Sequence, residues 1–89
     1  MVIRIATYNK KPTQHDNAPL MAAFHAWLRL QPGFRAGWQI HDSKSDKTLS
    51  VNVWADLASY QAMKDRIFPG ASTGPQPDKV EIFDELVEF

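Results

Sequence analysis

Residues 37–54, GWQIHDSKSDKTLSVNVW, contain the pattern that decides the fold. In the second half of this stretch, three aliphatic residues alternate with three others: Leu49, Val51 and Val53 with Ser50, Asn52 and Trp54. This period of two indicates a β-strand with two unlike faces. The polar residues 43–47 separate it from an earlier extended run, so the stretch predicts a hairpin whose strands cover 36–42 and 48–55.

A helical pattern precedes the hairpin over residues 18–31. Its apolar stripe has helical spacing and comprises Leu20, Phe24, Trp27 and Leu28. Asp16 or Asn17 can cap this helix, and Pro19 suits its first turn, where a missing N–H costs nothing. The Pro32-Gly33 pair ends the pattern, and the polar residues 10–17 before it predict a loop.

The outer parts of the chain add a second helix and two further strands. Asp56 is a suitable N-cap for a helix that begins after the hairpin and ends before the Pro69-Gly70 pair. Residues 2–9 and 79–89 have the β-branched and aromatic content of strands. The loop over 69–78 is long for so small a domain, which makes it a candidate lid or dimer arm, although a loop without a role is an equal alternative.

The resulting order is βαββαβ. With right-handed crossovers this order predicts an α+β fold, the ferredoxin-like plait, in which two helices cover one face of a four-stranded antiparallel sheet. A chain of 89 residues is long enough for one domain, so we expect a single domain over residues 1–89.

Alternation divides the strand residues into two groups. We expect the first to lie under the helices: Ile3, Ile5, Trp38, Ile40, Leu49, Val51, Val53, Val80 and Ile82. We expect the second to lie on the face away from them: Arg4, Tyr8, Gln39, His41, Ser50, Asn52, Trp54, Glu81 and Phe83. This second group is too aromatic to stay in water, so we expect a second copy of the chain to cover it in a homodimer.

Composition excludes several classes of protein. Ten basic and ten acidic side chains cancel, which argues against a nucleic-acid or membrane-surface partner. The absence of cysteine excludes disulfides, thiolate nucleophiles and cysteine-ligated metals. The three histidines, His15, His25 and His41, lack the close spacing of a zinc site, so no metal site is expected. Because no apolar stretch is long enough to span a bilayer, we expect a cytoplasmic protein.

Four short segments carry a family resemblance. They are VIRIATYN at 2–9, QPGF at 31–34, the hairpin at 37–54, and WADLASY at 54–60. Together they resemble the dimeric α/β-barrel superfamily, and within it the antibiotic-biosynthesis-monooxygenase-like family. The resemblance implies a dimer formed by two packed sheets and a ligand cavity between sheet and helices in each protomer. It also implies a monooxygenase that needs no cofactor and oxidises a small aromatic or quinol-like molecule after deprotonating it.

The candidate catalytic residues are His41, Trp54 and Tyr60. The ordinary pKa of histidine suits His41 to a general base, although a position in solvent or at a dimer contact also explains it. The ring nitrogen of Trp54 and the hydroxyl of Tyr60 can hold a substrate oxygen, although both residues also suit a core. The candidate substrate-binding residues are Tyr8, Asn9, Asn52, Phe24 and Trp27.

Other interpretations of the same residues remain open. Phe24 and Trp27 have the spacing of core residues, and His25 and Arg29, one turn apart on helix 18–31, are expected in solvent. Haem-degrading relatives keep an asparagine like Asn9, but they also use a histidine on or after the second helix, where this chain has none. The main alternative to a monooxygenase is a non-catalytic dimeric barrel that binds a ligand or serves a stress response, and an isomerase or lyase acting through His41 is the third.

Overall fold

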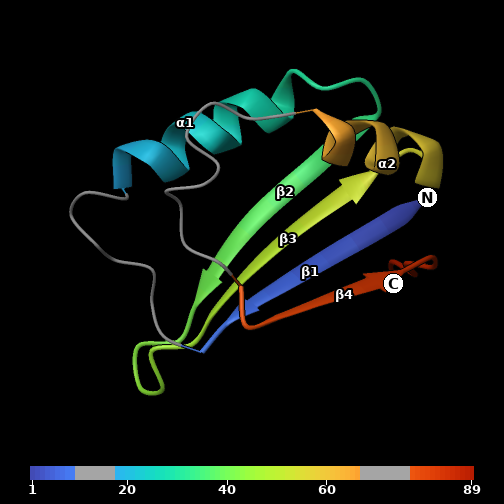
Figure 1. The fold of residues 1–89 in the computed structure, drawn as a ribbon. Helices are drawn as coiled ribbons and strands as arrows, with labels where there is room; N and C mark the ends of the chain where they lie inside the picture. Colours follow the sequence, from blue (N-terminus) through green and yellow to red (C-terminus); the bar gives the residue numbers. More distant parts are fainter. Residues whose placement is uncertain (10–17, 67–76) are drawn as a thin grey trace.

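A computed structural model describes residues 1–9, 18–66 and 77–89 (Figure 1). In these residues the elements follow the predicted order: β1 (Val2–Tyr8), α1 (Ala18–Arg29), β2 (Phe34–His41), β3 (Thr48–Trp54), α2 (Leu57–Asp65) and β4 (Lys79–Phe83). The expected loop at 10–17, with its candidate caps Asp16 and Asn17, lies outside the described residues. The same holds for residues 69–76 of the expected loop at 69–78.

The four strands form one antiparallel sheet in the order β2-β3-β1-β4. Both helices lie on the same side of this sheet, α1 beside β2 and α2 beside the end of β3 (Figure 1). This arrangement is the ferredoxin-like plait, so the predicted fold class is confirmed.

Two strand boundaries differ from prediction by more than one residue. β2 begins at Phe34, because a bulge between Phe34 and Ala36 allows Arg35 to be accommodated while pairing continues back to Trp54. β4 ends at Phe83, so the prediction of a strand through Phe89 is wrong in its second half. The last pair of this ladder is Ile3 with Phe83, and β1 begins only one residue before Ile3. Beyond that point almost no partner strand remains for β4.

The local signals around α2 act as predicted. Asp56 is the N-cap, and its carboxylate accepts a hydrogen bond from the backbone N–H of Ser59 at 2.7 Å. This bond, with the Ser59 side chain, lowers the pKa of Asp56 although the carboxylate is exposed. Gly33, the last residue between α1 and β2, has a φ of +84°, and its carbonyl accepts a hydrogen bond from the backbone N–H of Ala55.

The predicted assignment of the sheet faces is wrong for β1, β2 and β3. Val2 pairs with Trp54, and both belong to the core cluster that contains the helical residues Leu28, Tyr60 and Met63. The face toward the helices therefore carries Trp54 and its neighbours at every second position, including Asn52 and Ser50. Alternation separates two groups of side chains but does not say which group the helices cover. The bulky Trp54 ring is fully buried between the sheet and α2, so the helices cover the group of side chains that contains Trp54.

The assignment for β4 is right. Val80 and Ile82 pair with Ala6 and Arg4 and share the helix side, whereas Glu81 and Phe83 lie on the other side. We call that other side the helix-distal face. Its apolar members are Ile3, Ile5, Ala36, Trp38, Ile40, Leu49, Val51, Val53 and Phe83. This face is more apolar than predicted, because the mixed polar and aromatic group was expected on the side away from the helices.

The core lies between the helices and the end of the sheet where Val2 of β1 pairs with Trp54 of β3. Phe24, Trp27 and Phe34 pack against the buried cluster, and the Phe34 ring meets Trp54 edge-on with centroids 5.4 Å apart. Within the described ranges, neither helix has the length and apolar character needed to cross a membrane.

Candidate functional site

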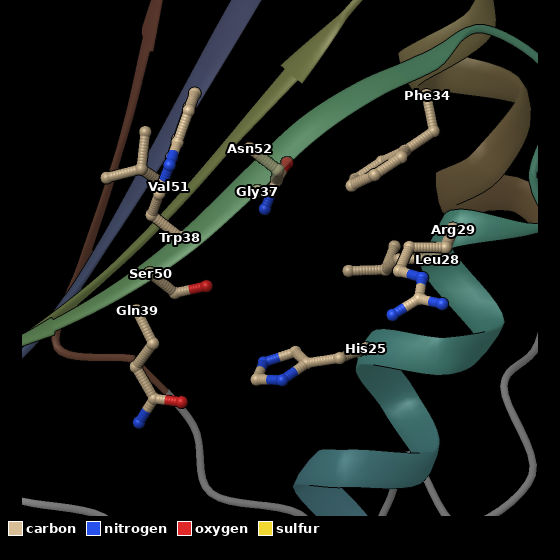
Figure 2. A pocket seen from close by; sticks show the side chains of 10 residues that line it. All are labelled: His25, Leu28, Arg29, Phe34, Gly37, Trp38, Gln39, Ser50, Val51 and Asn52. Carbon is tan, nitrogen blue, oxygen red and sulfur yellow. The ribbon is translucent and has the colours of Figure 1, made fainter.

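A cavity of about 290 Å³ lies between α1 and the strands β2 and β3 (Figure 2). Small-molecule sites usually have volumes of about 300–1,000 Å³, so this cavity suits a compact ligand. Its lining comprises His25, Leu28 and Arg29 of α1, Phe34, Gly37, Trp38 and Gln39 of β2, and Ser50, Val51 and Asn52 of β3. The side chains of Trp38 and Val51 point away from the cavity toward the helix-distal face (Figure 2).

The α1 wall carries two basic residues. His25 and Arg29 are four residues apart, so they occupy adjacent positions on one face of the helix, and both project into the cavity (Figure 2). Burial lowers the pKa of the His25 imidazole below its usual value, because desolvation penalises the charged ring. At neutral pH His25 is therefore an uncharged imidazole that can accept a proton.

The sheet wall is polar where it faces α1. Asn52 is 2% exposed, and its side-chain Oδ1 accepts a hydrogen bond of 2.7 Å from Nε1 of Trp54. Because that bond occupies the carbonyl end, the Nδ2 group of the amide is the end available to donate elsewhere. The hydroxyl of Ser50, two residues earlier on β3, lines the same wall.

Gly37 creates room for the cavity. It pairs with Asn52 across β2 and β3, so the β2 residue directly opposite Asn52 has no side chain. A Cβ at this position would lie 3.2 Å from Cζ of Phe34. The ring of Phe34 and the side chain of Leu28 supply the apolar part of the lining.

The sequence-predicted site residues fall into three places. Asn52 lines the cavity. Trp54 and Tyr60 lie together in the core, with ring centroids 6.2 Å apart, and Trp54 reaches the cavity only through its hydrogen bond to Asn52. Phe24 and Trp27 stack on each other on α1 at 6.1 Å and pack against that core.

The remaining three candidates lie at the opposite end of the sheet. His41 Nδ1 is 3.0 Å from the Thr48 hydroxyl, and its Nε2 is 3.5 Å from an Asp46 carboxylate oxygen. Tyr8 is half-buried and pairs with Thr48 across β1 and β3. Burial raises the pKa of its phenol, and the nearby Arg4 charge partly opposes that rise. Asn9 is exposed and donates its backbone N–H to Asp78.

Sequence reasoning missed four polar lining residues: His25, Arg29, Gln39 and Ser50. His25 and Arg29 were expected in solvent because they lie beside, and not on, the apolar stripe of α1. Arg29 is exposed as expected and also borders the cavity, whereas His25 is partly buried. One signal for the cavity was present. A glycine opposite an asparagine in the predicted hairpin marks a place where the residue across from a polar group has no side chain.

Comparison with known proteins defines the class of fold. No family model matches the sequence, and no curated protein matches it. Solved structures do match, and they place the chain in the fold of the antibiotic-biosynthesis-monooxygenase structures, which confirms the predicted resemblance at the level of the fold.

Three of these structures can be named. A crystal structure of an antibiotic biosynthesis monooxygenase matches with a TM-score of 0.73 and 22% identity over 98% of this chain and 100% of that one. SnoaB, a cofactor-independent oxygenase from Streptomyces nogalater, matches at 0.71 and 17% over 98% and 91%. A monooxygenase from the ActVA-Orf6 gene of Streptomyces coelicolor, in complex with Nanaomycin D, matches at 0.65 and 17% over 99% and 89%.

Proposed function

We propose that this protein is a cofactor-independent monooxygenase that oxidises a small aromatic or quinol-like molecule in the cavity between α1 and the sheet. The observation that carries the proposal is one ligand-sized cavity that combines apolar walls, Leu28 and Phe34, with an uncharged imidazole, His25. The three named structures of the same fold are described as oxygenases or monooxygenases, one of them cofactor-independent.

The chemistry requires a substrate that supplies its own electrons. For an anthrone, a base first removes a proton from the ring methylene and leaves an electron-rich anion. The anion gives one electron to dioxygen, and the resulting radical pair combines to form a C–O bond. Loss of the second methylene proton breaks the O–O bond. The methylene becomes a carbonyl, and the other oxygen atom leaves as water, so no external reductant is needed.

His25 is the proposed base, in place of His41. It lines the cavity, and its lowered pKa keeps it unprotonated at neutral pH, as a proton acceptor must be. Asn52 is the proposed hydrogen-bond donor to the substrate oxygen, because the bond from Trp54 directs its Nδ2 group away from the core. Trp54 and Tyr60 support this arrangement from behind. The proposal gives no role in the reaction to Tyr8, Asn9 or His41.

The proposed functional unit is a homodimer formed through the helix-distal face. Trp38 is 56% exposed and Ile40 is 52% exposed in the single chain, and they lie side by side with the aliphatic residues of β3 and β1. Exposed apolar patches of this kind on a small domain mark interaction surfaces. A two-fold dimer covers the patch with a second copy of itself.

Oxygen uptake with a panel of anthrones and hydroquinones tests the activity. We expect the wild type to consume dioxygen and His25→Ala to lower kcat by about 10²-fold or more, since general bases typically contribute 10²–10⁴-fold. His41→Ala is the matched control and should retain activity, because His41 lies outside the cavity lining. A chain whose activity depends on His41 and is indifferent to His25 would contradict the assignment of the base.

A non-catalytic ligand-binding dimer is the second candidate. It is favoured by the burial of two of the predicted catalytic residues: the Trp54 indole is fully buried and Tyr60 is 6% exposed, so neither ring is open to a substrate. Ligand binding in the cavity without oxygen consumption for any member of the panel would select this candidate.

A further inference from the structure

The cavity lining carries a positive charge on its α1 wall and no negative charge among the described lining residues. Among the described residues that line it, Arg29 alone carries a full charge at neutral pH, and no carboxylate is present. The described part of the chain also places no carboxylate within salt-bridge distance of the Arg29 guanidinium. A guanidinium that borders a cavity without a carboxylate partner attracts an anionic group from a ligand.

The opposite wall presents hydrogen-bond donors. The Asn52 carbonyl is already occupied by the Trp54 indole, which leaves the amide N–H groups, and the Ser50 hydroxyl can also donate. Donors on β3 therefore face the guanidinium on α1 across the cavity (Figure 2). His25 is uncharged, so recognition of an anion falls to Arg29.

We propose that the cavity selects a compact planar ligand that carries an ionised oxygen, as a carboxylate or a phenolate, and that Arg29 binds this oxygen. This inference names the ligand class of the site and rests on the cavity being the ligand site in the proposed function. Leu28 and Phe34 contact the ring, and Arg29 neutralises the charge at the α1 wall. The Asn52 amide donates to an oxygen of the ligand on the sheet side.

Isothermal titration with matched pairs of probes tests the inference. The carboxylate arm compares 2-naphthoate with the neutral 2-naphthamide, which has the same shape. The phenolate arm compares pentafluorophenol, which is ionised at neutral pH, with the neutral pentafluoroaniline. In the wild type we expect at least one anion to bind about tenfold or more tightly than its neutral partner, since charge-assisted bonds are about twice as strong as neutral ones. The arm that shows the preference identifies the oxygen.

Variants then assign the preference to one side chain. Arg29→Gln should abolish the preference for the anion and leave the affinity for the neutral probe within about twofold. Arg35→Gln is the control, because Arg35 is an exposed arginine outside the cavity lining and should leave the preference intact. Equal affinities within both pairs, no binding of any probe, or a preference that survives Arg29→Gln would each overturn the inference.

The outcome is separable from that of the proposed function. An Arg29-dependent preference without any oxygen consumption would retain the anion site and reject the monooxygenase. Oxygen consumption that depends on His25, with no preference for anionic probes, would retain the monooxygenase and reject the anion site.

Discussion

Trp54 and Asn52 lie two residues apart on β3 and form the most buried polar contact described above. The indole N–H of Trp54 has no contact with water, so it needs a partner, and the Asn52 carbonyl provides one. The same bond fixes which end of the amide is free. A residue of the core thus orients a residue of the cavity lining, and in the proposed site Trp54 would act through Asn52 without contact to a ligand.

Removing one partner of this bond should destabilise the protein. We expect Trp54→Phe to lower the free energy of unfolding by about 1–3 kcal/mol from the bond alone, because it leaves the buried Asn52 oxygen without a donor. The lost ring volume adds to that cost. Urea denaturation followed by circular dichroism measures the effect.

A double-mutant cycle with Asn52→Leu isolates the bond from the volume. If the two groups depend on each other, the double variant should lose less stability than the two single variants added together. Strictly additive losses would show that the hydrogen bond contributes no coupling.

His25 should make the stability depend on pH. Its pKa is lower in the folded chain than the usual value near 6.5, so between the two pKa values the unfolded chain binds more protons. Stability should therefore fall as the pH falls below about 6.5 and stay constant, for this group, above it. Arg29, one turn along α1, is the charged neighbour, and the facing residues Gln39, Ser50 and Asn52 are uncharged.

Urea midpoints measured between about pH 5 and pH 8 check this dependence. His25→Gln should reduce the slope of stability against pH, whereas His41→Gln should retain the part due to His25. An unchanged slope in the His25 variant would mean that burial of the His25 imidazole does not contribute to the pH dependence of stability.

At the scale of the elements, the junctions around Gly33 hold α1, β2 and α2 together. Gly33 adopts a left-handed conformation, and a side chain there would overlap the side chain of Ser59 on α2. Its carbonyl also accepts from Ala55, at the end of β3, at 2.7 Å. This glycine is therefore required both by its φ and by the close approach of α2.

Replacing this glycine should cost more than replacing the other glycine of the region. We expect Gly33→Ala to lower the free energy of unfolding by at least about 1–2 kcal/mol from the left-handed conformation alone. Gly37→Ala is the matched control, because its φ is not left-handed and its Cβ would meet the edge of the Phe34 ring at 3.2 Å and the Val51 carbonyl oxygen at an ordinary 3.5 Å. Thermal and urea denaturation of both variants compares the two costs, and an equal loss would contradict the argument.

For the whole molecule, the largest unexplained feature of the single chain is its helix-distal face. Ile3 and Val53 at its centre are buried. Trp38 and Ile40 near one edge are 56% and 52% exposed, and Phe83 near the other edge is 45% exposed. The aliphatic side chains of β1, β2 and β3 lie on this face, and the more polar set lies under the helices. A surface this apolar favours a partner that covers it.

A charge on this face should break the proposed dimer. We expect the wild type to sediment as a dimer at micromolar concentration and Trp38→Glu to sediment as a monomer, since burying an unpaired carboxylate at an apolar interface is unfavourable. Leu30→Glu is the control, because Leu30 is 81% exposed yet lies at the end of α1, away from the face. A monomeric wild type would remove the basis of the dimer proposal.

Local signals were sufficient to predict the elements. Asp56 and Pro32-Gly33 act over a few residues, through hydrogen bonds and backbone preferences that do not depend on the rest of the fold. The extent of β4 was not predictable in this way, because its end depends on where β1 runs out of pairing partners. The candidate site was predicted only in part. Asn52 lines the cavity as expected of a binding residue, and Arg29 is exposed as expected, but the sequence did not predict that Arg29 and the partly buried His25 border a cavity.

By itself the sequence determined the order of elements, their approximate ends and the two-group alternation of the strands, because each of these depends on neighbours along the chain. Only the tertiary structure decided which strand group faces the helices and which α1 residues border the cavity. The physical reason is that a period of two is symmetric between the faces. The choice depends on how Trp54, Leu28, Tyr60 and Met63 fill the space between the layers, and residues far apart in the chain meet only there.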